Sequence, residues 1–188
     1  PNVCKNVTTV ASKVCSDIFL AKYDSNGQEK WTKQILSSSK EIANGIAVDS
    51  LGNIYLTGFT SGALEGANSG SNDIFLVKYS SDGTLQFKEQ FGSTGDDNGL
   101  GLKVDSKDNV YVTGYTEGGL DGNTNIGNTD IFLVKYDSNG TKQWTKQLGT
   151  SSSDYGYGVA SDLSGNIYVS GYTSGSLDGN TSSGGNDI

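Results

Sequence analysis

DIFLVKYDSNGTKQWTKQ, residues 130–147, decides the fold of this chain, because near copies of it occupy residues 17–34 and 73–90. The three copies begin 56 and 57 residues apart. Self-similarity at a fixed period of this length is typical of proteins built from one repeated supersecondary unit. The chain therefore has to be interpreted as an array of repeats.

A second unit runs between these copies, GVASDLSGNIYVSGYTSG at 158–175, and it recurs at 45–62 and 101–118. Its segment NIYVSGYT alternates β-branched or aromatic residues with small or polar ones, as a pleated strand requires. The segments SLGN and DSNG are rich in residues that tolerate positive φ, which predicts tight turns. Each repeat thus predicts four strands, A (GIAVD), B (NIYLTGFT), C (DIFLVKY) and D (KQWTKQL).

Four antiparallel strands per repeat, with a period of 40 to 60 residues, indicate an all-β fold in which each unit is one blade of a β-propeller. The short, Gly-led strand A suits the crowded central channel. Strand D carries Lys and Gln between its aromatics, which suits an outer edge. We expect the aromatics at equivalent positions to pack between blades: Trp31, Phe87, Trp144, Phe59, Tyr115 and Tyr172.

The combination GVAxDxxGNIYVxGYTSGSLDGNT followed by DIFLVKYDSNGTKQWTKQLGT resembles the bacterial β-propeller repeat called SBBP, after seven-bladed propellers. The resemblance covers roughly residues 17–188. It implies a propeller of the kind found in exported or surface-associated bacterial proteins. It brings no catalytic motif that could be transferred to this chain.

The strand pairs amount to three blades, beginning half way through one and stopping half way through another. Two explanations remain at this point. The chain is part of a longer one, or the terminal A–B hairpin of one copy completes a blade with the first C–D hairpin of another, building larger rings or fibres. The predicted divisions are an N-terminal segment 1–16, repeats 17–72, 73–129 and 130–186, and a further repeat starting at 187.

Both cysteines, Cys4 and Cys15, precede the repeats. We expect them to form a disulfide, the alternative being two unpaired thiols in a terminal segment. A disulfide together with a thiol-free body predicts an extracellular, periplasmic or cell-surface location. The formal charge of −8 and the lack of any Arg argue against nucleic-acid binding, and no apolar run is long enough for membrane insertion.

The long connections, B–C and D–A, are predicted to share one face, and loops of that kind carry function more often than the scaffold does. They hold eight acidic residues against one base, Lys40, which accounts for −7 of the charge of −8. The acidic residues are Glu41, Glu65, Asp96, Asp97, Glu117, Asp121, Asp154 and Asp178.

Two ligands suit such a face. Ca²⁺ binds carboxylate and amide oxygens, and the LDGNT segments offer Asp121, Asn123, Asp178 and Asn180, although the same residues also form Asx-turns. We expect no other cofactor.

The second ligand is a protein or glycan partner. Tyr155 and Tyr157 could stack on it, or could pack under the loop. The residues predicted to bind such a ligand are Asp96, Asp97, Asp121, Asn123, Asp154, Tyr155, Tyr157, Asp178 and Asn180.

Catalysis is disfavoured, because the chain has no His and no Arg. A Ser-His-Asp triad, an imidazole base and the arginine grip of propeller sialidases are therefore excluded. A carboxylate pair such as Asp96 and Asp97 could act on a sugar, but adjacent residues usually point apart. The sequence predicts a binding or scaffolding module, not an enzyme.

Overall fold

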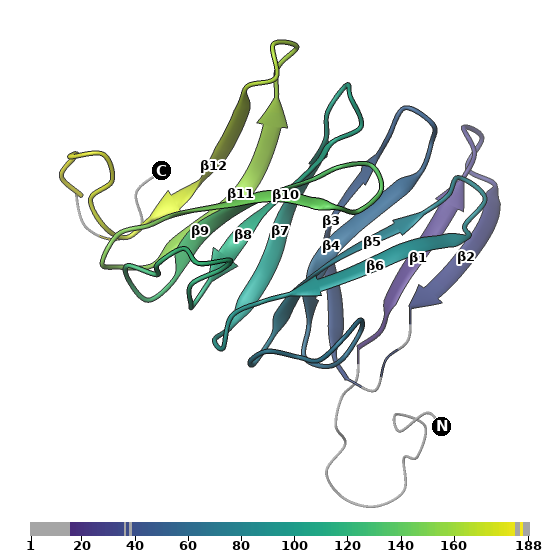
Figure 1. The fold of residues 1–188 in the computed structure, drawn as a ribbon. Coiled ribbons are helices and arrows are strands. Elements are labelled where there is room, and N and C mark those ends of the chain that lie inside the picture. The colour runs from purple at the N-terminus through teal and green to yellow at the C-terminus, as the bar shows by residue number, and fades with distance from the viewer. Residues whose placement is uncertain (1–15, 36, 38, 183–184, 186–188) are drawn as a thin grey trace, which may run out of the picture.

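The computed structural model describes residues 16–35, 37, 39–182 and 185, and these form twelve antiparallel strands (Figure 1). Cys4 and Cys15 lie outside the described residues. Two sheets contain four strands each, in the orders β3-β4-β5-β6 and β7-β8-β9-β10. Two further sheets contain two strands each, β1-β2 and β11-β12. The all-β fold class and the predicted order A-B-C-D are confirmed.

Blade 1 consists of β3 (Glu41–Val48), β4 (Ile54–Thr60), β5 (Asp73–Tyr79) and β6 (Leu85–Phe91). Blade 2 consists of β7 (Asp97–Val104), β8 (Val110–Thr116), β9 (Asp130–Tyr136) and β10 (Lys142–Leu148). The hairpin β1 (Ile18–Tyr23) and β2 (Glu29–Ile35) supplies strands C and D of a half-blade before them, and β11 (Asp154–Ser161) and β12 (Ile167–Thr173) supply strands A and B of a half-blade after them.

Strand A is longer than the sequence pattern predicted. It begins at Glu41, Asp97 and Asp154, about four residues before the predicted GIAVD segment. The reason is a β-bulge, which shifts the register between Gly99 and Gly101 and at the equivalent glycines. A bulge breaks the period of two, so the alternation that marks a strand in the sequence is interrupted there.

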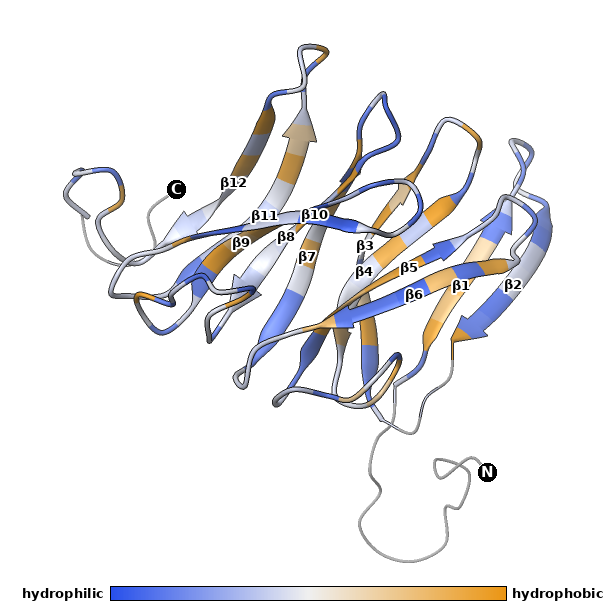
Figure 2. Cartoon of the chain, in the orientation of Figure 1, coloured by the Kyte–Doolittle hydropathy of each residue, from blue (hydrophilic) through white to orange (hydrophobic). Residues whose placement is uncertain are grey.

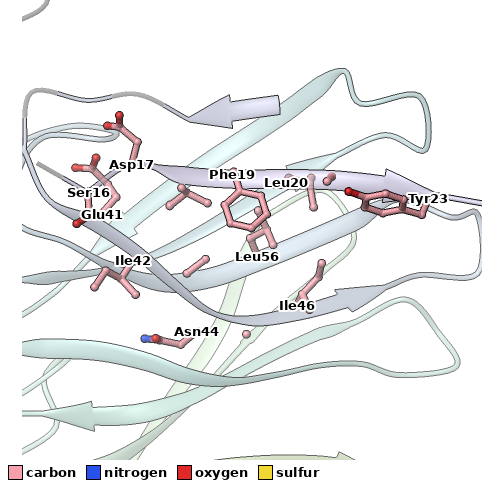
Figure 3. A pocket seen from close by; sticks show the side chains of 14 residues that line it. Ser16, Asp17, Phe19, Leu20, Tyr23, Glu41, Ile42, Asn44, Ile46 and Leu56 are labelled. Atoms are coloured by element: carbon pink, nitrogen blue, oxygen red, sulfur yellow. The ribbon is translucent and has the colours of Figure 1, made fainter. Parts of the chain in front are cut away.

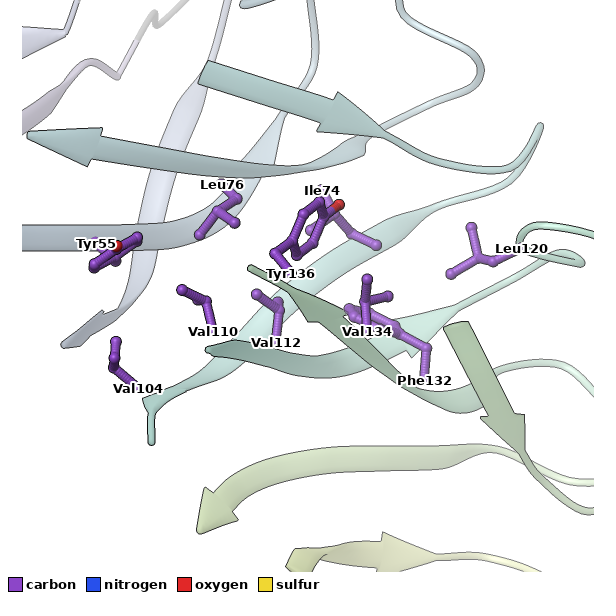
Figure 4. Close-up of a cluster of buried hydrophobic side chains, with 10 residues drawn as sticks. All are labelled: Tyr55, Ile74, Leu76, Val104, Val110, Val112, Leu120, Phe132, Val134 and Tyr136. Carbon is purple, nitrogen blue, oxygen red and sulfur yellow. The ribbon is translucent and has the colours of Figure 1, made fainter. Parts of the chain in front are cut away.

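The core lies between blades and repeats with them. One cluster joins β4 and β5 of blade 1 to β8 and β9 of blade 2, with Ile74, Val112 and Phe132 among its fully buried members (Figure 4). The Phe91 ring meets the Phe132 ring edge-on, with centroids 6.2 Å apart. The outer strands β2 and β6 are mostly hydrophilic (Figure 2), as expected for strand D.

The tight A–B turns are built by one repeated hydrogen-bond set. In blade 2, Asp105 accepts bonds from the backbone N–H groups of Lys107 and Asn109, from the Asn109 side chain and from the Tyr111 hydroxyl. Asp49 and Asp162 hold their turns in the same way. The spacing D-x-x-x-N-x-Y therefore connects each turn to the following strand. Among the described residues no helix is long and apolar enough to cross a membrane.

Candidate functional site

The B–C and D–A connections emerge at one end of the strands and the tight turns at the other (Figure 1). We call the first of these the long-loop face. The innermost strands β3, β7 and β11 contact one another, and they carry the D–A connections toward the centre of this face. Side chains at the start of these three strands are therefore placed closest to the channel.

Three of the acidic residues predicted to lie on this face are buried, so that part of the prediction is wrong. Glu41, Asp97 and Asp154 are the first residues of strand A, with at most 1% of each exposed. Asp97 accepts hydrogen bonds from the backbone N–H and the hydroxyl of Ser93 and from the hydroxyl of Thr116. Asp97 and Asp154 thus stabilise the junction between blades and do not face a ligand.

Burial raises the pKa of Asp97, and the carboxylate of Asp73 adds to this effect, while the hydrogen bonds from Thr116 and Ser93 oppose it. Burial likewise raises the pKa of Glu41. A sequence signal for this role exists: a Ser or Thr precedes each acid by four residues, as in Ser93 and Asp97. It was obscured because these segments were assigned to loops.

The predicted Ca²⁺ ligands are engaged with the protein itself. Asp121 forms an ion pair with Lys142, with 2.6 Å between Oδ1 and Nζ, and also accepts a hydrogen bond from Thr145. Asn123 donates its side-chain N–H to the carbonyl of Leu120. The second pair behaves similarly, since Asn180 donates to the carbonyl of Leu177 and Asp178 has a positive φ of 52°. These contacts correspond to the loop-forming alternative.

No group of three or more acidic, His or Cys side chains within the described ranges could hold a metal ion. The Ca²⁺ site thus stays a prediction without a ligand cluster. Asp96 and Asp97 also do not form a pair: the Asp96 carboxylate accepts bonds from Asn72 and from Tyr115, whereas Asp97 points into the blade junction. Because neighbouring strand residues point to opposite faces, the two carboxylates cannot act on one substrate atom.

The tyrosines are gathered into one cluster. Tyr155 stacks on Tyr172, with centroids 4.9 Å apart and planes at 26°, and meets Tyr115 edge-on at 4.8 Å. Tyr157 lies 5.9 Å from Tyr172 and is 52% exposed. We call Tyr115, Tyr155, Tyr157 and Tyr172 the tyrosine cluster. Tyr155 and Tyr157 belong to β11 and not to a loop, which corrects their predicted placement.

The sequence assigned Tyr115 and Tyr172 to packing between blades, so half of this cluster was missed as a site. The missing signal is the register, which pairs Tyr155 with Tyr172 across β11 and β12. Polar groups border the cluster: the Tyr115 hydroxyl donates to Asp96, 3.0 Å away. Burial, followed by the charge of Asp96, raises the pKa of Tyr115 to about 12, so this hydroxyl remains neutral at physiological pH.

Four-stranded blades with an inner-to-outer order A-B-C-D define a β-propeller repeat protein. Residues 30–64, 86–121 and 143–178 match the family model of the SBBP β-propeller repeat, and the chain belongs to that family.

Two curated relatives are similar in sequence. The regulatory protein FlaEY of Caulobacter vibrioides is 33% identical over 143 residues, 68% of this chain and 15% of the relative. The uncharacterized WD repeat-containing protein L264 of Acanthamoeba polyphaga mimivirus is 29% identical over 204 residues, 89% of this chain and 14% of the relative. This chain thus spans about one seventh of either relative's length.

A crystal structure of a protein of unknown function from Bacteroides caccae has a similar fold. The TM-score is 0.53 at 9% sequence identity, over 85% of this chain and 52% of the other. That identity supports the shared fold alone. The relatives' names describe regulatory or repeat proteins and not enzymes.

Proposed function

We propose that this chain is a non-catalytic binding module of an exported bacterial protein, and that its long-loop face binds a glycan through the tyrosine cluster. The supporting observation is the cluster itself, in which Tyr155 and Tyr172 stack and Tyr157 is half exposed beside them. Tyrosine offers a flat apolar ring and a hydroxyl that can hydrogen-bond, which suits the faces and hydroxyl groups of sugars.

The charge of the face favours a neutral ligand over an anionic one. Asp96 borders the cluster, and Glu117 accepts a hydrogen bond from its backbone N–H. Two other acids of the face are partly neutralised, since Asp121 pairs with Lys142 and Glu65 lies 3.7 Å from Lys88. An anionic sugar would meet these carboxylates without any Arg to bind it, because the chain has none.

A glycan array with matched neutral and acidic sugars tests the proposal, followed by calorimetry on any ligand found. Tyr157→Ala should weaken binding about 5- to 100-fold, the range of a lost aromatic contact of about 1–3 kcal/mol. Leu51→Ala is the control, because Leu51 is exposed in a tight turn at the opposite end of the strands. An array without any neutral hit, or binding that Tyr157→Ala leaves unchanged, would contradict the proposal.

Export rests on different support: the described repeats contain no cysteine, and the relative from Caulobacter is bacterial. Secretion into an oxidising compartment predicts that Cys4 and Cys15 are joined. Mass spectrometry of the native protein after alkylation, with and without reductant, checks this. Alkylation of both thiols without reductant would contradict it.

A further inference from the structure

Two strands in the described part of the chain have an edge without a neighbour. Strand β12 pairs with β11 alone and strand β1 with β2 alone, whereas the equivalent strands β4, β5, β8 and β9 are paired on both sides. One end of the arc therefore presents strands A and B without C and D, and the other presents C and D without A and B (Figure 1). Each end supplies what the other lacks.

Equivalent residues show the cost of these open edges. Phe75 and Phe132, both in strand C, are fully buried, whereas Phe19 at the same position of β1 is 73% exposed. In strand B, Tyr55 and Tyr111 are buried, whereas Tyr168 of β12 is 57% exposed. Large exposed aromatic residues at positions that are buried elsewhere in the same chain indicate surfaces that are covered by another element.

A groove of about 500 Å³ lies beside β1 and is lined by Phe19, Leu20, Ile42, Ile46 and others (Figure 3). It lies along the free side of β1, next to β3, where strands A and B of a completed blade belong.

A second groove, of about 510 Å³, lies beside β12 and includes Ile131, Leu148 and Gly171. It lies where strands C and D would cover blade 2. In blade 2 the ring of Phe132 packs on Phe91, the last residue of the preceding strand D. Leu148 is the residue equivalent to Phe91, and it is exposed. The ring of Phe19 therefore fits the second groove against Leu148.

Charge complementarity supports the same match. In blade 1 the Lys78 ammonium lies 4.9 Å from the centre of the Tyr55 ring and 3.8 Å from Asp49. In blade 2 Lys135 lies over Tyr111. The residues equivalent to Lys78 and Tyr55 at the two open edges are Lys22 and Tyr168. The Lys22 ammonium already donates to the carbonyl of Ser81, as Lys78 does to that of Ser138. It is thus held in the position from which it would meet a second ring.

We propose that two copies of this chain pair head to tail, with β12 of each copy pairing with β1 of the other. Ile54 pairs with Tyr79 in blade 1 and Val110 with Tyr136 in blade 2. The same register joins Ile167 to Tyr23 and Val169 to Ala21 of the second copy. Two copies then contain six blades, within the 4–8 of natural propellers. A head-to-tail contact of this kind closes into a ring when the rotation between copies allows it.

Disulfide cross-linking of the full chain tests the register. Ala21→Cys and Val169→Cys are combined in a background of Cys4→Ser and Cys15→Ser. Directly opposed residues place their Cβ atoms about 4.5–5.5 Å apart, close enough for a disulfide after a small adjustment. The two edges lie at opposite ends of one chain, so the bond must join two chains. The expected product on oxidation is a covalent dimer.

The control moves one cysteine to Lys22, which turns its side chain to the other face of the strand. Equal cross-linking by Lys22→Cys with Val169→Cys would overturn the proposed register. A ladder of higher oligomers would overturn the closed two-copy ring.

Native mass spectrometry and sedimentation measure the association itself. The expected species of the unmodified chain is a dimer, and Val169→Glu should convert it to a folded monomer with the same far-UV circular dichroism. Leu85→Glu is the matched control, because Leu85 is similarly exposed on β6 of a complete blade and should leave the dimer intact. A monomer at every concentration tested, or a dimer that persists in Val169→Glu, would overturn the proposal.

Discussion

The buried acid at the junction between blades 1 and 2 makes a prediction in which charge and hydrogen bonding can be separated. A Cβ on Gly92 would lie 2.5 Å from Asp73 Oδ1 and 2.9 Å from Asp97 Oδ2, so these two oxygens are at most 5.4 Å apart. Both residues are fully buried, and Asp73 Oδ1 has no hydrogen-bond partner. Within the described residues neither acid forms an ion pair with a lysine. Two negative charges at this separation disfavour each other's ionisation.

Asp97→Ala and Asp97→Asn should therefore differ in sign. In Asp97→Ala the backbone N–H of Ser93 loses its acceptor, which costs about 1–3 kcal/mol, while the hydroxyls of Ser93 and Thr116 can turn to other acceptors. Adding the lost packing, we expect a loss of about 2–4 kcal/mol. Asn keeps an acceptor for Ser93 and removes the buried charge. We expect Asp97→Asn to be at least as stable as the wild type at pH 7.

The pH dependence follows from the raised pKa of Asp97. A group whose pKa is higher in the folded state contributes stability that is complete below its unfolded pKa, about 3.9, and is lost as pH rises through the folded value. Asp97→Asn lacks this loss, so its stability relative to the wild type should increase between about pH 4 and pH 8. Using the difference from wild type cancels the other acids.

Urea unfolding followed by circular dichroism at several pH values measures these differences. Asp97→Asn as damaging as Asp97→Ala at pH 7 would refute the reasoning, because the carboxylate charge itself would then be required. A difference from wild type that does not vary with pH would show that the pKa of Asp97 is not raised on folding.

Three further changes test the scaffold. Phe132→Ala removes a fully buried ring between blades and should cost about 3–5 kcal/mol, measured as a lower urea midpoint. Gly99→Ala would place a Cβ 2.4 Å from Thr57 Oγ1 and should cost about 1–3 kcal/mol from overpacking; an unchanged melting temperature would contradict the close blade contact. Although burial alone would raise it, hydrogen bonds from Asn109 hold the pKa of Asp105 below its usual value. Its contribution is thus lost as pH falls, and Asp105→Ala should cost about 1.5–3 kcal/mol at pH 7 and progressively less in acid.

The repeat period alone was enough to predict the blade, its four strands and their order, because each of these depends on local patterns. Alternation in NIYVSGYT and turn residues such as those after Asp162 act within a few positions along the chain. The two faces of the propeller also followed from the sequence, since hairpins of known length fix which connections lie together. The strand boundary at Asp97 could not be predicted, because the bulge at Gly99 and Gly101 interrupts the alternation.

The tertiary structure decided which polar and aromatic residues belong together. Asp97 and Asp121 are both acids in long connections, yet the first is buried against the neighbouring blade and the second pairs with Lys142 at the surface. The tyrosine cluster joins residues from β8, β11 and β12, which come together only when blade 2 and the half-blade pack.

The sequence by itself determined the repeated blade, since strand propensity, turn chemistry and hydrophobic alternation all act over a few residues. Only the tertiary structure decided that Phe19 is exposed while Phe75 and Phe132, in the same sequence context, are buried. The physical reason is that burial depends on the neighbouring blade, which local sequence does not specify. Identical strands therefore form core where a neighbour is present and an open edge where it is not.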